Sequence, residues 1–231
     1  MPRSIPKFPK VLALDTSGPF CAIGTATESY SAGVVHEMAR GQAEALFPLA
    51  EARLKEIGWS MQDLDALGVS VGPGNFTGIR IGVSAAKGLA LSLGIPVYGV
   101  SNFELAALSQ HLGLDRITIS LPAPRDQAYV QSFIAGAPAG PPALIDPDTP
   151  PADLLPSGVH SIFGHRASTI AKRFSLSGED EGFSPAPAQL AERTEELFLA
   201  ASGAPDDSAS PLYIRPADAA PPKDAGPVIV S

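Results

Sequence analysis

The chain has 231 residues, a formal net charge of −8 at pH 7 and 45% hydrophobic residues. This length is sufficient for one large domain or two small lobes with a sizeable core. The negative charge argues against unaided binding to nucleic acid, because neutralising phosphates requires a basic surface. A single cysteine, Cys21, excludes a disulfide framework, and no apolar run is long enough to span a membrane. The first ten residues contain no apolar signal segment, so we expect a cytoplasmic protein.

The first sixty residues predict three strands followed by a helix. Apolar runs between short turns predict the strands over residues 10–16, 20–27 and 30–38. Apolar residues at helical spacing predict a helix over 42–57, which Gly58 ends. Asp15 lies near the end of the first strand. There it either holds a metal ion or a phosphate, or caps the turn through its own side chain.

The stretch 69–82 (VSVGPGNFTGIRIG) predicts a strand, a glycine-rich turn and a helix that begins at Ile79. Gly72, Gly74 and Gly78 allow positive φ angles and close approach of another backbone. Two interpretations remain open at this point. The turn is either a cradle for a phosphate group or a structural turn that packs the helix tightly on a sheet. It is neither a Walker loop nor a dinucleotide fingerprint, because both spacings fail.

The helix predicted over 79–93 carries apolar or small residues nearly all round. Such a helix must be covered on more than one side. A partner subunit or the rest of this chain would provide that cover, and the sequence does not decide between them.

The second half alternates short strands and helices. Strands are predicted over 97–100, 117–121, 128–134 and 161–163, and helices over 103–112, 167–174 and 188–201. Proline is dense over 138–156 and predicts a loop or an extended crossing there. Residues 212–215 resemble a short strand, and we expect the Ala- and Pro-rich tail that follows to be disordered.

Motifs for self-sufficient catalysis are missing from the sequence. There is no HExxH or HxxxH pair for a metal, and no GxSxG elbow surrounds any serine. Cys21 lies in an apolar strand and is expected to be an inert buried thiol. We therefore expect neither catalytic residues nor a bound metal.

Three segments carry a specific resemblance: VLALDTS at 11–17, RGQAEALFPLAEARL at 40–54, and GVSVGPGNFTGIRIGVSAAKGLALSLGIPVYGVS at 68–101. They resemble the TsaB (YeaZ) family, the dimerisation subunit of the bacterial complex that makes threonylcarbamoyladenosine at position 37 of tRNA. The resemblance is strong over 10–108 and recurs at PLYIR near residue 213.

The resemblance implies an α/β actin-like ATPase fold of the RNase H-like class, with two lobes of mixed β-sheet and helices. It places a first, partner-binding lobe at 1–102, a smaller lobe with the Pro-rich insertion at 103–216, and a tail at 217–231. It also implies a non-catalytic scaffold subunit that binds a TsaD-like catalytic subunit together with a TsaE-like ATPase. In isolation such a chain forms a homodimer, and tRNA reaches it only through the complex.

Two sets of site residues follow from the resemblance. The partner interface is expected at Gln42, Leu46, Leu49, Arg53, Arg80, Ser84, Ala85, Lys87, Gly88 and Leu91. A vestigial nucleotide site, with no cofactor or at most weak binding of ATP or ADP, is expected at Asp15, Thr16, Ser17, Gly72, Gly74, Asn75, Thr77 and Gly78. Pro122 departs from an acidic family pattern and weakens the case for a nucleotide.

Two alternative functions remain open beside the scaffold role. One is an ATP-dependent phosphotransferase of the same superfamily, and the other is an M22-type glycoprotease homologue, which would need a paired metal site.

Overall fold

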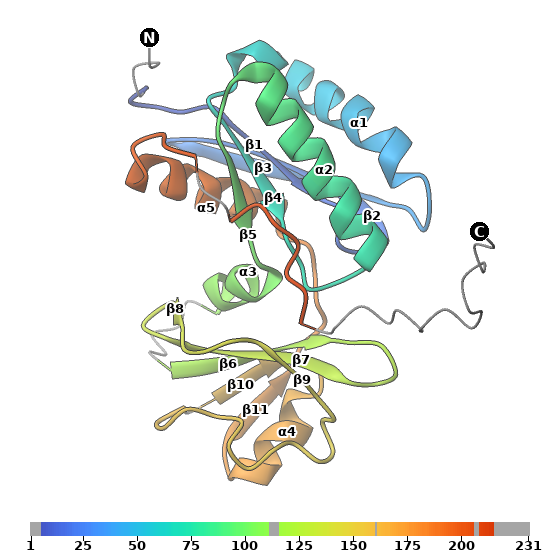
Figure 1. Ribbon diagram of the computed structural model, residues 1–231, viewed down its shortest axis with the longest axis vertical. Coiled ribbons are helices and arrows are strands. Elements are labelled where there is room, and N and C mark those ends of the chain that lie inside the picture. Colours follow the sequence, from blue (N-terminus) through green and yellow to red (C-terminus); the bar gives the residue numbers. More distant parts are fainter. Residues whose placement is uncertain (1–5, 111–115, 160, 206–207, 215–231) are drawn as a thin grey trace, which may run out of the picture.

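The computed structural model describes residues 6–110, 116–159, 161–205 and 208–214. The chain forms two lobes, each built on one β-sheet, with helix α3 (Asn102–Ser109) between them (Figure 1). The expected disordered tail at 217–231 lies outside the described residues.

The first sheet has five strands in the order β3-β2-β1-β4-β5. Their bounds are β1 (Val11–Asp15), β2 (Phe20–Thr27), β3 (Tyr30–Glu37), β4 (Ala66–Ser70) and β5 (Val97–Val100). Strands β1, β2 and β3 form an antiparallel meander, whereas β4 and β5 run parallel to β1. The central strand β1 is buried on both faces, as its continuous apolar sequence predicts.

Helices cover both faces of this sheet. Helices α1 (Gln42–Glu56) and α2 (Phe76–Leu93) lie side by side on one face, and α5 (Pro187–Ala200) lies on the other (Figure 1). Helix α2 begins three residues before the predicted Ile79, because the Asn75 side chain accepts a hydrogen bond from Gly78 N and caps the helix. A 3-10 turn, Met61–Asp63, leads into β4.

The second sheet repeats the topology of the first. Its order is β11-β10-β6-β7-β8, and β9 pairs with β7. The strands are β6 (Arg116–Pro122), β7 (Ala128–Ile134), β8 (Ala137–Pro138), β9 (Ala143–Ile145), β10 (Ser161–Gly164) and β11 (Ser177–Asp180), with helix α4 (Ala167–Phe174) packed on one face. In both lobes the central strand is antiparallel to its successor and parallel to a later strand. This duplication confirms the expected fold class.

Two local predictions in the second half were wrong. The Pro-rich segment contains β8 and β9, and Ile145 is buried, because proline is tolerated at the edge of a sheet. Residues 211–214 form no strand, although Leu212 N donates a hydrogen bond to Val71 O at 2.9 Å. Strand β11 was not predicted, since SGED carries no apolar alternation.

The C-terminal helix α5 belongs to the first lobe, although it lies in the range 103–216 expected for the second. Its buried residues Leu190, Ala191 and Phe198 share a core cluster with Val11 and Ala13 of β1. A Cβ at Gly68 of β4 would overlap the Thr194 hydroxyl, so the helix sits close on the sheet. Amphipathicity predicted this helix but not which sheet it covers.

Candidate functional site

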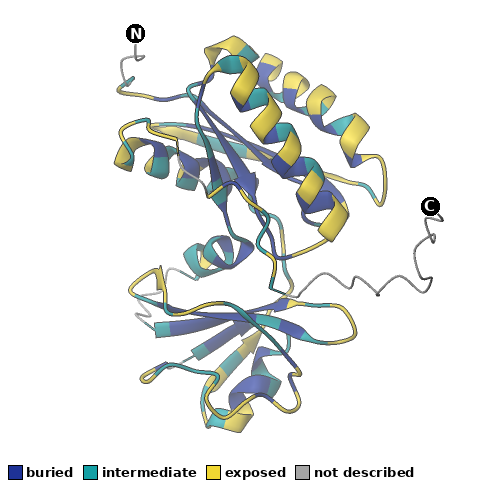
Figure 2. Ribbon diagram, viewed as in Figure 1, coloured by how far each residue is buried: buried dark blue, intermediate teal, exposed yellow. Residues whose placement is uncertain are grey.

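Helices α1 and α2 present a broad exposed surface, which we call the α1–α2 face. Figure 2 shows their outer sides exposed while the strands beneath them are buried. Three large apolar side chains point into solvent here: Phe47 on α1, and Phe76 and Leu91 on α2. Leu91 is 86% exposed. Phe76 and Leu91 lie near opposite ends of α2, and Leu91 is the more open of the two to a partner.

The charges on this face are segregated by helix. The exposed charged residues of α1 are mainly acidic, Glu44, Glu51 and Glu56, with Lys55 as the exception, whereas those of α2 are the basic Arg80 and Lys87. Ser84 and Gly88 lie on the same exposed side of α2, and a Cβ added at Gly88 would contact nothing within 4 Å. The small residues leave room for a close approach of another helix.

The predicted partner residues divide into three groups. Arg80, Ser84, Lys87, Gly88 and Leu91 are exposed on α2, while Leu49 and Ala85 are half-buried. Gln42, Leu46 and Arg53 are directed inward, which contradicts their prediction as interface residues.

Those three residues serve the chain's own packing. Leu46 is buried in the core beneath α1, and Gln42 Nε2 donates a hydrogen bond to Gly18 O. Arg53 is directed onto the sheet, where its guanidinium donates to the Tyr30 hydroxyl. A helix that packs on a sheet uses one face for that contact, and these residues lie on that face.

The N-terminus of α2 is linked to the C-terminal segment. The Arg80 guanidinium lies 3.8 Å from the centre of the Phe76 ring. Arg80 Nε donates to the Tyr213 hydroxyl at 2.9 Å, and the Tyr213 ring lies 5.6 Å from Phe76. The FTGIR and PLYIR segments, far apart in the sequence, are therefore in contact in the fold.

The glycine-rich turn packs against the turn after β1. Of its three glycines only Gly72 has a positive φ, 92°. A Cβ at Gly74 or Gly78 would overlap the carbonyl oxygen of Ser17 or Thr16, respectively. Asn75 N also donates to Ser17 O at 2.6 Å. These contacts support the structural interpretation of the turn, because they hold α2 tightly on the sheet.

Asp15 is buried at the end of β1, within a small polar cluster. Its Oδ1 accepts from Ser17 N at 2.8 Å, while Oδ2 has no hydrogen-bond partner among the described residues. Asn102 connects the cluster: its side chain donates to Ser17 Oγ and accepts from Ser70 Oγ, both at 2.9 Å. Burial raises the pKa of Asp15, and hydrogen bonds from Ser17 oppose that shift. The bond to Ser17 N supports the interpretation of Asp15 as a turn cap.

A cleft of about 910 Å³ opens between the lobes beside this cluster. Of the predicted nucleotide residues, Ser17, Gly74 and Asn75 line it; Asp15, Thr16, Gly72 and Gly78 are buried behind it; and Thr77 is exposed on α2. Its walls are mainly apolar, with Phe20, Met38 and Tyr129 among them, and Glu37 is the charged residue. No Lys or Arg is among the described residues that line it. The described lining therefore offers a triphosphate no cationic side chain.

Sequence reasoning missed Asn102 as the centre of the polar cluster and Tyr129 as a cleft residue. Neither occurs in a motif, and only the folded chain brings them near Ser17.

Among the described residues there is no group of three His, Cys, Asp or Glu side chains that could hold a metal ion. Burial also raises the pKa of the Cys21 thiol to about 11. In the same part of the chain no helix is long and apolar enough to cross a membrane.

Comparison with known proteins identifies the family. An uncharacterised protein of Mycobacterium tuberculosis, Rv3421c, is 34% identical over 214 residues, which cover 87% of this chain and 93% of that protein. A solved Pseudomonas aeruginosa protein described as similar to peptidase YEAZ superposes with a TM-score of 0.75 at 25% identity, covering 90% of this chain and all of that one. The chain belongs to the TsaB (YeaZ) family.

Two further similarities connect this family member with tRNA modification. The Escherichia coli tRNA threonylcarbamoyladenosine biosynthesis protein TsaB is 30% identical over 122 residues, 52% of this chain and 53% of that protein. The family model described as TsaD, tRNA N6-adenosine threonylcarbamoyltransferase, matches residues 22–135. That range contains both helices of the α1–α2 face.

Proposed function

We propose that this chain is a non-catalytic subunit of the complex that transfers threonylcarbamoyl to adenosine 37 of tRNA. In this proposal it binds and supports a TsaD-like catalytic subunit through the α1–α2 face. The observation that carries the proposal is the pairing of exposed apolar side chains with segregated charge on that face. Membership of the TsaB family and the similarity of residues 22–135 to the transferase support it.

The segregated charge favours a two-fold or pseudo-two-fold contact. If the partner carries the same pair of helices, a two-fold axis brings the acidic α1 of each subunit towards the basic α2 of the other. The residues matched by the TsaD model include this helix pair. A second copy of this chain would satisfy the same geometry, so the isolated chain forms a homodimer through the face it offers to the transferase.

The proposed role also implies how the other subunits and the tRNA join the complex. A TsaE-like ATPase joins the pair, and the tRNA contacts the complex mainly through the other subunits, because this chain carries a net charge of −8. The site of action is the cytoplasm, where tRNA is modified. The lobe cleft binds ATP or ADP weakly at best, since its described lining offers a carboxylate and no cation.

The test places a charge on the α1–α2 face. Leu91→Glu changes an exposed side chain of α2, and Leu199→Glu makes the same change on α5, where Leu199 is 45% exposed on the opposite side of the sheet. Leu91→Glu should leave the monomer folded and weaken association with the TsaD-like subunit by at least about tenfold, because a buried unpaired charge costs several kcal/mol. Leu199→Glu should associate like the unmodified chain.

The measurements are co-purification, sedimentation velocity of the isolated chain, and tRNA modification by the reconstituted complex. Ser84→Glu tests the same face at a second exposed position. Ala86 is fully buried, so Ala86→Glu would unfold the chain and is unsuitable, whereas Ala85 is half-buried. If Leu91→Glu and Ser84→Glu both associate normally, the interface lies elsewhere and the proposal is wrong.

A further inference from the structure

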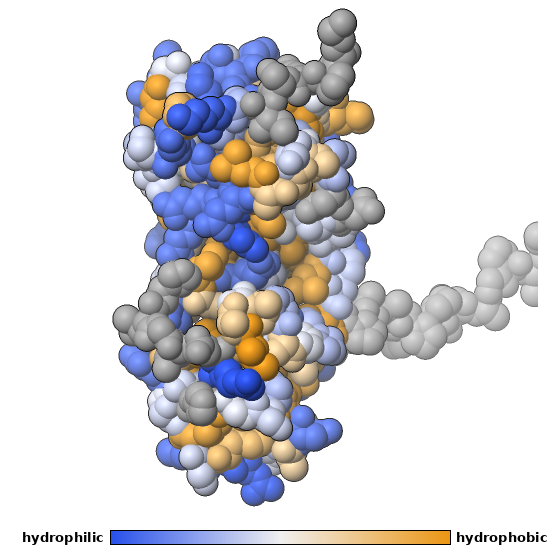
Figure 3. All heavy atoms as spheres, turned by 90° about the vertical axis from the view of Figure 1, so that its left-hand side faces the viewer, coloured by the Kyte–Doolittle hydropathy of each residue, from blue (hydrophilic) through white to orange (hydrophobic). Residues whose placement is uncertain are grey.

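A second cavity lies where the chain crosses between the lobes, on the other side of α3 from the first sheet. It has a volume of about 220 Å³. Its walls come from α3, from β6 and β10, and from residues 181–186, which connect β11 to α5. Both connections between the lobes therefore contribute to it. On the side of the molecule shown in Figure 3, hydrophobic atoms gather at mid-height between the lobes.

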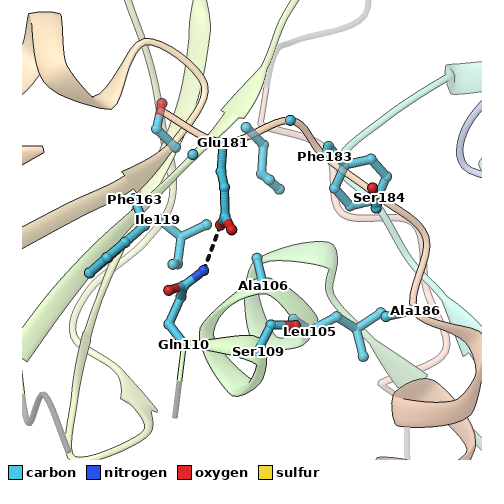
Figure 4. A pocket seen from close by; sticks show the side chains of 14 residues that line it. Leu105, Ala106, Ser109, Gln110, Ile119, Phe163, Glu181, Phe183, Ser184 and Ala186 are labelled. Atoms are coloured by element: carbon cyan, nitrogen blue, oxygen red, sulfur yellow. Dashed lines mark hydrogen bonds between the residues drawn. The ribbon is translucent and has the colours of Figure 1, made fainter. Parts of the chain in front are cut away.

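Part of the wall of this crossover pocket is apolar. Figure 4 shows Ile119 and Phe163 on one side, Phe183 on the other, and Ala106 of α3 beneath them. Ile119 and Phe163 are buried, and all four side chains pack in one core cluster. A preformed apolar wall on rigid elements favours binding of a small apolar group.

The polar side chains of the lining are Ser109, Gln110, Ser120, Glu181 and Ser184. Gln110, which follows α3, donates from Nε2 to Glu181 Oε2 at 2.6 Å across the pocket (Figure 4). Glu181 N donates to Gly164 O, which ties the start of the connection to β10. The hydrogen bond from Gln110 uses one of the two carboxylate oxygens, and Glu181 is exposed.

The charge of the lining selects the ligand class. Glu181 is the charged residue of the pocket, and none of the described residues that line it is Lys, Arg or His. A carboxylate or phosphate would be repelled, whereas a cationic group gains an ion pair at Glu181. The volume is somewhat larger than the cavity of about 150 Å³ that holds benzene in an engineered protein. It therefore fits one ring with a short arm.

We propose that the crossover pocket binds a small primary amine that carries one aromatic or branched aliphatic group. The apolar group lies between Ile119, Phe163 and Phe183, and the ammonium group contacts the Glu181 carboxylate. Because the pocket is built from both lobe connections, the bound amine also stabilises one arrangement of the lobes. This site is separate from the α1–α2 face, so its failure would leave the proposed function untouched.

The experiment compares three probes of matched shape on the full chain by calorimetry at pH 7. These are 2-phenylethylamine, the neutral 2-phenylethanol and the anionic 3-phenylpropionate. The amine should bind with a dissociation constant of about 1 mM or tighter, as expected for a ligand of this size. The alcohol should bind more weakly, and 3-phenylpropionate should bind least. No saturable binding of the amine below about 10 mM, or equal binding of the anion, would overturn the proposal.

Two variants locate the site. Glu181→Gln should weaken amine binding about five- to tenfold and leave the alcohol unchanged, because it removes the charge and keeps a hydrogen-bonding group. Glu179→Gln makes the same change at an exposed residue outside the pocket and should have no effect. Ala106→Leu fills the cavity and should abolish binding of both probes. If Ala106→Leu does not fold, a crystal structure with the amine decides: density anywhere else, or none at saturating concentration, contradicts the site.

Discussion

Among single residues, Asp15 stands out as a carboxyl group buried without a cation beside it. Burial disfavours its charged form, so its pKa is raised above the ordinary 3.8 despite the hydrogen bonds from Ser17. The unfolded chain releases this proton at a lower pH than the folded chain. Folding is therefore linked to proton uptake at Asp15, and its contribution to stability falls as the pH rises from 3.8 to the raised pKa.

Asp15→Asn should remove this dependence while retaining an oxygen that accepts from Ser17 N. We expect the free energy of unfolding of the variant, relative to the unmodified chain, to increase as the pH rises from about 4 to the raised pKa of Asp15, since other titrating groups cancel in the difference. Each unit of pKa elevation corresponds to about 1.4 kcal/mol. Urea unfolding of both chains at several pH values measures it. A difference that stays constant with pH contradicts the assignment.

Gly74 tests the packing of the glycine-rich turn. Its φ is not positive, so the reason for glycine here is the Ser17 carbonyl oxygen, which a Cβ would overlap. Gly74→Ala should destabilise the fold by roughly 1–3 kcal/mol. Gly88→Ala is the matched control, because a Cβ there meets nothing. It should stabilise α2 by about 0.5–1 kcal/mol. Urea denaturation compares the two, and equal stability of both variants would show that the turn tolerates a side chain.

Between elements, the contact of α2 with residues 211–214 holds the C-terminal segment on the first lobe. Arg80 donates to the Tyr213 hydroxyl, and Leu212 N donates to Val71 O at the end of β4. Tyr213 is 54% exposed, so its hydroxyl contributes little to global stability. Its effect should be local, on the attachment of this segment.

Tyr213→Ala removes the ring and the hydroxyl together, whereas Tyr213→Phe keeps the ring contact with Phe76. We expect Tyr213→Ala to accelerate hydrogen exchange at the Leu212 amide. Local opening of an exposed segment requires less free energy than global unfolding, so a lost local contact affects it most. Tyr213→Phe should produce a smaller acceleration, and amides of β1 should be unaffected in both. Unchanged exchange at Leu212 in Tyr213→Ala would mean that the backbone bond to Val71 suffices.

In the whole molecule, the two lobes share one topology, and a cleft lies between them. The described lining of that cleft has no cation, and Glu37 contributes a negative charge. We expect the isolated chain to hydrolyse no ATP and to bind it weakly at best. Calorimetry with ATP and Mg²⁺ measures this directly. Micromolar affinity that Asp15→Ala abolishes would favour the phosphotransferase alternative.

The sequence by itself determined most elements of the first lobe. Strands β2 and β5 occupy their predicted ranges, and α1 differs only at its end. In the second lobe, β7 and α4 also match. These elements carry strong local signals: apolar periodicity, and turns or caps at glycine and proline. The motifs at 11–17 and 68–101 also sufficed to identify the family, because they combine residue identity with spacing.

Only the tertiary structure decided which side of each element faces the protein. Gln42 and Leu46 match the family segment, yet they face the core, whereas the neighbouring Phe47 faces solvent. Helix α5 returns to the first sheet although its sequence follows the second, because that sheet has a second apolar face to bury. The inter-lobe cleft and the crossover pocket arise from contacts between distant residues. No local pattern encodes them.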